Sequence, residues 1–294
     1  MTRYHPDEPL LPARDEHVAE WFALSMTTCC ASTLKNYFYG LKAAHRTNNL
    51  HCPPLSELVR AAETLKGIRR IRRDVVRRVH AISLHDIYLV SLVVRRRAAD
   101  SSRSVKDKKN DRTTLAAMLV GFYGMLRKSN LTGRMALRRC DMRSDGNVLW
   151  LSFHESKVIQ HGERVHTVPL VRAGRADLCP VQALIGHVQD CPAGPNAGAF
   201  RWSTSATVQV DLTHETFTRH MRGMLGEAGL NPAQYTGHSL RRGGATLAFE
   251  LGASVQDIKR HGDWSSDVVY TYHQVSDSTR CSLPSRMAAT AIRC

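Results

Sequence analysis

The residues best suited to chemistry lie in one short segment near the C-terminus, 236–273. His238 and Arg241 are three residues apart, so on a helix their side chains share one face. A guanidinium group carries a permanent charge and can donate two parallel hydrogen bonds to a phosphate. Glycines at 237, 243 and 244 let a backbone or a ligand approach closely. Taken alone, the pair could equally be an ordinary surface histidine and arginine.

Three aromatic residues with polar groups follow in the same segment. Trp264 supplies an indole N–H donor, and Tyr270 and Tyr272 supply two phenols. Packing residues of a terminal helix would give the same pattern. Its combination with the His-x-x-Arg pair favours a site that handles a phosphate.

The composition favours a polyanionic partner. The 294 residues include 41 Lys and Arg against 26 Asp and Glu, a formal net charge of +15, and 43% are hydrophobic, enough for a real core. A basic excess of this size is typical of nucleic-acid-binding proteins. We expect the basic clusters to bind backbone phosphates: Arg69, Arg70, Arg72, Arg73, Arg95, Arg96, Arg97, Lys106, Lys108 and Lys109.

The eight cysteines are scattered without a C-x-x-C pair, which suits neither a disulfide framework nor a zinc cluster. We expect reduced, mostly buried thiols and an intracellular protein. No metal site is indicated. No apolar run has the length of a membrane span, and the first residues do not form a signal peptide.

Hydrophobic periodicity predicts a mainly α fold with a small β-sheet, of the α+β class. A helical first part, 1–82, with helices over 15–46 and 53–70, precedes a second part, 83–294. The arginine-rich stretch 66–78 between them suits a linker or an arm along DNA. In the second part we expect helices over 83–98, 113–131, 179–189 and from about 213 onward, loops over 100–112 and 192–202, and a β-hairpin of 148–157 with 165–170.

The ordered motifs resemble those of the tyrosine recombinase (phage integrase) family. The wording "GHSLRRGGAT…IKRHGDWSSD…Y" is particularly like that of recombinases of eukaryotic mobile elements. Upstream, "GFYGMLRKSNL" is similar to the box of the first catalytic arginine, which makes that residue Arg127. The hairpin "FHESKVIQHGERVHTVPL" is similar to the one with the catalytic lysine, which makes it Lys157. Asn130 stands where the family often has Glu.

The attacking tyrosine has two candidates, because the family commonly has a histidine, or a tryptophan in its place, nine residues before the nucleophile. Tyr270 follows His261 by nine residues, and Tyr272 follows Asp263 by nine. The longer motif match, over "GDWSSD", aligns Asp263 with the family's histidine position and Trp264 with its aromatic hydrogen-bond donor. Motif context therefore favours Tyr272, with Tyr270 and His261 as the alternative.

The resemblance implies a site-specific recombinase or integrase that cleaves and rejoins DNA through a 3′-phosphotyrosyl link, without metal or cofactor. Arg127 and Arg241 would hold the phosphate oxygens and Trp264 would donate to one of them. His238 would take the phenol proton, and Lys157 would protonate the leaving 5′-oxygen. Residues 1–82 would be the helical, SAM-like core-binding domain and 83–294 the catalytic domain.

Double-stranded DNA and other copies of the chain are the implied partners: a dimer on a site and a tetramer in a synapse, with the tail 276–294 docked on a neighbouring protomer. No membrane partner is expected. The compartment would be the nucleus in a eukaryote and otherwise the cytoplasm, at the nucleoid. Two alternatives stay open: an inactive, transposon-derived DNA-binding protein, and a type IB topoisomerase. The opening "YHPDEPLLPARDEHV" is typical of the segment that leads into a domain. This pattern is also compatible with a chain that is a fragment of a longer protein.

Overall fold

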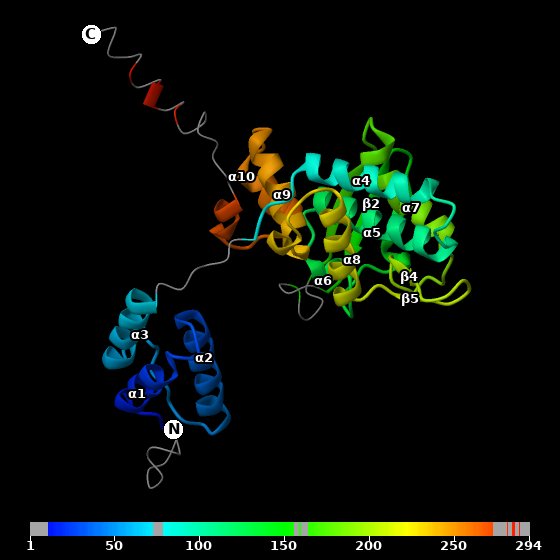
Figure 1. Cartoon of the computed structure of the whole chain (residues 1–294). Helices are drawn as coiled ribbons and strands as arrows, with labels where there is room; N and C mark the ends of the chain where they lie inside the picture. The colour runs from blue at the N-terminus through cyan, green and yellow to red at the C-terminus, as the bar shows by residue number, and fades with distance from the viewer. Residues whose placement is uncertain are drawn as a thin grey trace. The chain divides into compact units, whose positions relative to one another are not determined.

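In the computed structural model the chain forms two compact units, residues 1–77 and 78–294 (Figure 1). The structure describes residues 11–72, 79–155, 159, 164–272, 281, 284, 285 and 288. The boundary expected at residue 82 falls inside the second unit, because Ile82 is fully buried in that unit's core. Its backbone N–H also donates to the carbonyl of Ser239.

The first unit is a small helical bundle of α1 (Asp15–Ser25), α2 (Ala31–Thr47) and α3 (Val59–Arg72). Its core gathers apolar side chains at helical spacing, among them Phe22, Leu34 and Phe38. The helix expected over 53–70 begins only at residue 59. The reason is a tertiary contact, since the Asp15 carboxylate accepts hydrogen bonds from the first backbone N–H groups of α3, those of Arg60 and Ala61.

The second unit is built around the buried helix α5 (Val105–Tyr123), whose residues 116–122 are all buried. Helices α4 (Leu84–Ala99), α7 (Pro180–Asp190), α8 (His214–Glu227) and α9 (Gly237–Glu250) pack against it (Figure 1). Short elements complete the unit: α6 (Lys128–Leu131), α10 (Val255–Gly262), and the 3-10 turns η1 (Arg139–Asp141), η2 (Ala176–Leu178), η3 (Pro232–Gln234) and η4 (Asp267–Tyr272).

The β-structure is antiparallel. Strands β1 (Met142–Asp145), β2 (Val148–Phe153) and β3 (His166–Val171) form one sheet in that order. Leu149, Leu151 and Phe153 alternate toward the core, which fixes the register of β2 on β3. The predicted hairpin and the α+β class are confirmed, whereas β1 and the second hairpin, β4 (Arg201–Ser203) with β5 (Gln209–Asp211), were not foreseen.

Two loop predictions were wrong in part. Residues from 105 onward, expected as loop, form the first turns of α5, because the Ser104 hydroxyl accepts from the Asp107 backbone N–H and caps the helix. The loop expected over 192–202 ends in strand β4. Conversely, the helix expected over 113–131 ends at Tyr123, and Met125 then adopts a left-handed conformation with φ 48° before α6 begins.

The cysteines are less buried than expected. All those that the structure describes are free, and of these only Cys179 and Cys191 are buried. Within the described part of the chain, no helix combines the length and the apolar character needed to span a bilayer.

Candidate active site

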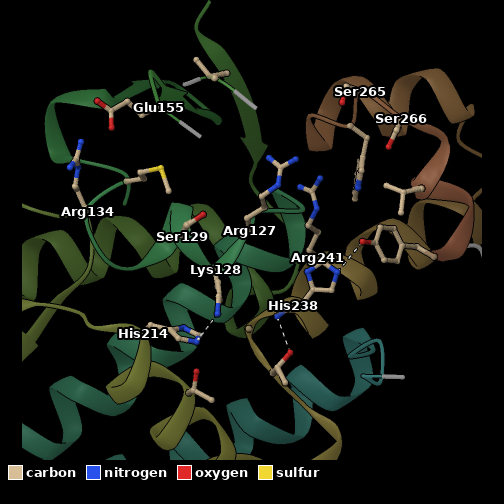
Figure 2. Close-up of a pocket in the computed structure, with 18 of the residues that line it drawn as sticks. Arg127, Lys128, Ser129, Arg134, Glu155, His214, His238, Arg241, Ser265 and Ser266 are labelled. Carbon is tan, nitrogen blue, oxygen red and sulfur yellow. Dashed lines mark hydrogen bonds between the residues drawn. The ribbon is translucent and has the colours of Figure 1, made fainter. Parts of the chain in front are cut away.

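A single cavity of about 1270 Å³ in the second unit collects most of the predicted catalytic residues (Figure 2). Its walls come from α6, α8, α9 and the segment that follows α10. The predicted residues among its lining are Arg127, His238, Arg241, Trp264 and Tyr272. Four stretches far apart in sequence thus meet at one place, as a site for a single phosphate requires.

The His238 ring and the Tyr272 hydroxyl form the centre of the site, with His238 Nε2 2.9 Å from the phenol oxygen. Two contacts fix the pair. Thr236 caps α9 by accepting from the His238 backbone N–H, and the Thr246 hydroxyl donates to the Tyr272 carbonyl at 2.8 Å. His238 keeps an exposed edge, yet burial of its ring and then the charge of Arg241 lower its pKa to about 4. A neutral imidazole can accept the phenol proton.

Arg241 is almost fully enclosed, with 2% of its surface exposed. One guanidinium nitrogen donates to the Met125 carbonyl at 2.6 Å, and its Cζ lies 3.6 Å from the centre of the Trp264 ring. The other terminal nitrogen, Nη2, is buried without a hydrogen-bond partner among the described residues. Burial, followed by repulsion from Arg127, lowers the pKa of Arg241 to about 9. A cation of this kind is stabilised when an anion enters the cavity.

Arg127 stands at the start of α6, where the Asn130 amide oxygen accepts from its backbone N–H at 3.2 Å. The Asn130 that departs from the family pattern therefore holds the arginine's backbone. The Arg127 guanidinium donates to the carbonyl of Asp263 at 2.9 Å and lies 3.4 Å from its carboxylate. Burial alone would raise the pKa of Asp263, but the hydrogen bond from Arg164 and nearby positive charges hold it below its usual value. Asp263 is therefore ionised at neutral pH.

Glycines bring these elements close enough to build the site. A Cβ atom on Gly244 would lie 2.1 Å from the Phe122 carbonyl oxygen, and one on Gly243 would lie 1.9 Å from that of Ile82. At Gly262 it would lie 1.9 Å from the Trp264 ring. Gly244 lets α9 press against α5, and Gly243 lets α9 lie against the backbone that precedes α4. Gly262 lets the indole fold back over the end of α10.

The alternative nucleophile has different surroundings. Tyr270 is 52% exposed and does not line the cavity. His261, its proposed companion, donates from Nε2 to the Tyr123 carbonyl at 2.8 Å, which commits this ring nitrogen to the protein backbone. Lys157 lies outside the described residues, although Glu155 and Ile159 on either side of it line the cavity.

The basic residues predicted to bind DNA divide by exposure. Arg69, Arg70, Arg95 and Arg96 are accessible, although Arg95 and Arg96 also pair with Asp177 and Glu227. Of the three lysines, Lys106 and Lys108 are half-buried, and Lys109 donates to the Asp190 carbonyl. Arg73 lies outside the described residues.

Two of the arginines predicted to bind DNA instead make ion pairs or hydrogen bonds within the protein. Arg97 is 11% exposed on its side chain and is paired with Asp111 and Glu227. Arg72 donates to the carbonyls of Met26 and Cys29 within the first unit. Both guanidinium groups have partners inside the protein, which is why a basic run could not be assigned to DNA residue by residue.

Sequence reasoning missed further basic residues of the cavity: Lys128, Arg134, His214 and Arg222. The Lys128 ammonium lies 3.1 Å from His214 Nε2, and burial together with this charge lowers the pKa of His214 (Figure 2). Lys128 follows Arg127 in the same motif, and this position could have identified it as a site residue. His214 lies in none of the recognised motifs, so no sequence signal pointed to it. Among the described residues, no group of three or more His, Cys, Asp or Glu could hold a metal ion.

Comparisons with known proteins give one curated relative and several solved structures of the same fold. No protein-family model matches the sequence. The integrase/recombinase XerD homolog of Selenomonas ruminantium is 24% identical over 270 residues, which cover 89% of this chain and 74% of that protein. This relative's name gives no support to the narrower resemblance to eukaryotic mobile elements, which stays a prediction.

Solved structures share the fold. The XerH site-specific recombinase in a post-cleavage complex with a palindromic difH substrate has a TM-score of 0.63 at 14% identity, covering 94% of this chain and 73% of its own. The Tn1549 transposon integrase in complex with transposon right end DNA has a TM-score of 0.59 at 14% identity. The match covers 97% of this chain and 90% of that one. A lambda integrase dimer bound to a COC′ core site has a TM-score of 0.56 at 18% identity. The match covers 92% of this chain and 82% of that one.

Proposed function

We propose that the chain is a tyrosine recombinase that acts as a site-specific DNA recombinase or integrase. It cleaves and rejoins double-stranded DNA through a 3′-phosphotyrosyl intermediate. One observation carries the proposal: the Tyr272 hydroxyl is hydrogen-bonded to a neutral His238 in the cavity that also contains Arg127 and Arg241.

The cleavage step would use these residues as follows. The Tyr272 oxygen forms a bond to the scissile phosphorus while His238 Nε2 takes its proton. The bond between phosphorus and the 5′-oxygen breaks, and this oxygen takes up a proton for which Lys157 is the proposed donor. Nη2 of Arg241, together with Arg127, would donate to the non-bridging oxygens, where negative charge develops. Rejoining reverses these transfers with the 5′-hydroxyl of the same or another strand.

Tyr272 is the proposed nucleophile and Tyr270 is not. Its hydroxyl has a proton acceptor at 2.9 Å, its ring lies 5.6 Å from that of Trp264, and the guanidinium of Arg242 lies 5.7 Å from its ring centre. Positive charge near the phenol stabilises the oxygen as it loses its proton. Among the described residues Tyr270 has no proton acceptor of this kind, and its side chain does not line the cavity.

DNA binding would combine the cavity with the exposed cations of both units, Arg69 and Arg70 in the first and Arg95 and Arg96 in the second. Such contacts hold the duplex by its phosphates without reading its sequence. We also propose that recombination uses a dimer on each site and a tetramer in the synapse. Gel filtration with DNA, with and without residues 276–294, tests the role of the tail; an unchanged tetramer contradicts it.

The decisive experiment is covalent trapping. Duplexes that the protein binds are first selected from a randomised pool, and a nick is then moved across each selected sequence, so that cleavage releases a short strand and cannot be reversed. We expect a protein–DNA band that survives denaturation. Specific binding without this band would instead indicate a protein that binds DNA without cutting it.

Matched variants assign the nucleophile. Tyr272→Phe should abolish the band and leave DNA binding intact, because the ring stays and only the attacking oxygen is removed. Tyr270→Phe removes a phenol two residues away and should leave the band at the wild-type level. Survival of the band in Tyr272→Phe would overturn the assignment.

A further inference from the structure

An acidic side chain contacts Arg127, a residue that lines the site proposed to bind an anion. Asp263 is 8% exposed and adopts a left-handed conformation at the end of α10, with φ 58° and ψ 54°. A carboxylate near a phosphate opposes binding, and non-glycine residues seldom adopt this backbone conformation. Two unfavourable features at one residue of a site indicate that the residue has a function there.

The contacts of Asp263 join three elements. Its carboxylate is paired with Arg164, which precedes β3, and lies 3.4 Å from Arg127 Nη1 at the start of α6. Its backbone carbonyl accepts from Arg127 Nη2 at 2.9 Å. The left-handed turn permits both, since it directs the carbonyl and the side chain of one residue toward the same guanidinium. The orientation of Arg127 is therefore set from two sides.

A second contact ties the same two elements together. His166, the first residue of β3, donates from Nε2 to the carbonyl of His261 at 3.1 Å. Residues 154–165 connect β2 to β3 and are called the β2–β3 link. Arg164 and His166 thus attach the end of this link to the end of α10. This link contains Lys157, the proposed proton donor. The ion pair of Arg164 with Asp263 is the charged part of this attachment.

We propose that Asp263 is a positioning residue for strand cleavage: it orients Arg127 and, through Arg164, anchors the residues that precede β3 to the end of α10. The inference rests on the proposed function. Asp263 itself does not touch the phosphate. Its negative charge weakens the attraction for DNA, and in return Arg127 is held in place before DNA binds.

The test measures cleavage and binding separately in Asp263→Asn. Asparagine tolerates the left-handed conformation and keeps the shape, so that only the charge is removed. DNA binding should be as tight as in the wild type or tighter, because a negative charge next to Arg127 has been removed. The rate of covalent trapping on the nicked duplex should fall by about 10²-fold, the typical cost of a misplaced group. Loss of structure would weaken both.

Two further variants complete the design. Asp177→Asn is the matched control, because it also removes a carboxylate paired with arginines, Arg95 and Arg175, but neither of these arginines lines the cavity. It should cleave like the wild type. Arg164→Gln, at a half-exposed side chain, should slow cleavage as Asp263→Asn does, and the double variant should be no slower than either single one.

A readout independent of activity is the rate at which trypsin cuts after Arg164. This cut should accelerate in Asp263→Asn relative to the cut after the exposed Arg172, as followed by mass spectrometry. If the wild type forms no covalent band, the proposed function fails, and the trypsin rates still decide whether the anchor exists. If the wild type forms the band and Asp263→Asn or Arg164→Gln forms it equally fast, only the positioning role is overturned.

Discussion

At the scale of single residues, the site depends on an imidazole that is kept neutral by its neighbours. Burial of its ring, and then the charges of the neighbouring arginines, lower the pKa of His238 to about 4, so Nε2 can accept a proton throughout the neutral range. The same arginines provide the charge that a phosphate needs. One cluster of cations therefore both binds the anion and keeps its proton acceptor unprotonated.

His238→Gln tests this proton path. Glutamine can still make a hydrogen bond to Tyr272 but cannot take up its proton, so the trapping rate should fall by about 10²–10⁴-fold. Binding of the uncleaved duplex, measured by fluorescence anisotropy, should change little. In the wild type, the cleavage rate should not fall through protonation of free His238 until the pH approaches 4. A variant that cleaves at the wild-type rate would exclude His238 as the proton acceptor.

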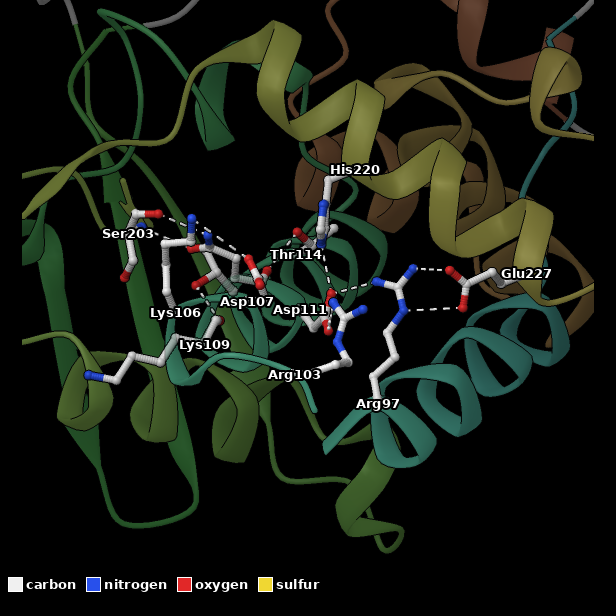
Figure 3. A network of polar contacts seen from close by, with 12 residues as sticks. Arg97, Arg103, Lys106, Asp107, Lys109, Asp111, Thr114, Ser203, His220 and Glu227 are labelled. Carbon is white, nitrogen blue, oxygen red and sulfur yellow. Dashed lines mark hydrogen bonds and ion pairs between the residues drawn. The ribbon is translucent and has the colours of Figure 1, made fainter. Parts of the chain in front are cut away.

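At the scale of the elements, a buried ionic network ties α4, α5 and α8 together (Figure 3). Asp111 on α5 is 1% exposed and is surrounded by Arg97, Arg103 and His220, while Arg97 also pairs with Glu227 of α8. The pKa of Asp111 is lowered, since the hydrogen bond from His220 and the arginine charges outweigh its burial. The network fixes α8, which supplies His214, Thr218 and Arg222 to the cavity wall.

The neighbours Arg96 and Arg97 give a direct comparison of an exposed and a buried ion pair. Arg97→Met should lower the free energy of unfolding by about 3 kcal/mol, because it leaves a buried carboxylate without its closest partner. Arg96→Met removes a pair whose arginine is 67% exposed and should cost less than about 1 kcal/mol. Urea denaturation measures both. Equal effects would mean that the network contributes nothing special to stability.

At the scale of the whole molecule, two units with separate cores share a net charge of +15. The charge serves a polyanionic partner, and it makes the folded state sensitive to acid, because every further proton adds repulsion. A buried histidine strengthens this sensitivity. His187 on α7 is 3% exposed, and its Nε2 accepts from the Arg201 backbone N–H, so burial lowers its pKa to about 4.

This histidine predicts the pH range in which stability is lost. The unfolded chain binds a proton at His187 near pH 6.5, and the folded chain only near 4. Stability from this group is therefore complete above pH 6.5 and falls by up to about 3 kcal/mol as the pH decreases to 4. Urea denaturation between pH 7 and 4 should show a flatter dependence in His187→Gln, whereas His51→Gln, at an exposed position, should keep the wild-type slope. Identical slopes in all three proteins would contradict the assignment.

Local patterns were enough for much of the fold. Alternating residues predicted the β2–β3 hairpin, and helical spacing predicted α2, α4 and α7, because a strand or helix face must bury its apolar side chains whatever surrounds it. The resemblance of the motifs around Arg127, His238 and Arg241 to those of the tyrosine recombinase family predicted a shared phosphate site.

Tertiary structure decided what depends on contacts between distant residues. Spacing could not separate Tyr270 from Tyr272, since only the packing of η4 against α9 puts one phenol beside His238 and leaves the other exposed. Likewise Arg96 and Arg97 look alike in sequence, and the partners that bury one of them come from residues 111 and 227. Side-chain types and local periodicity can be read from the sequence. Burial and charge pairing arise only when folding brings distant segments together.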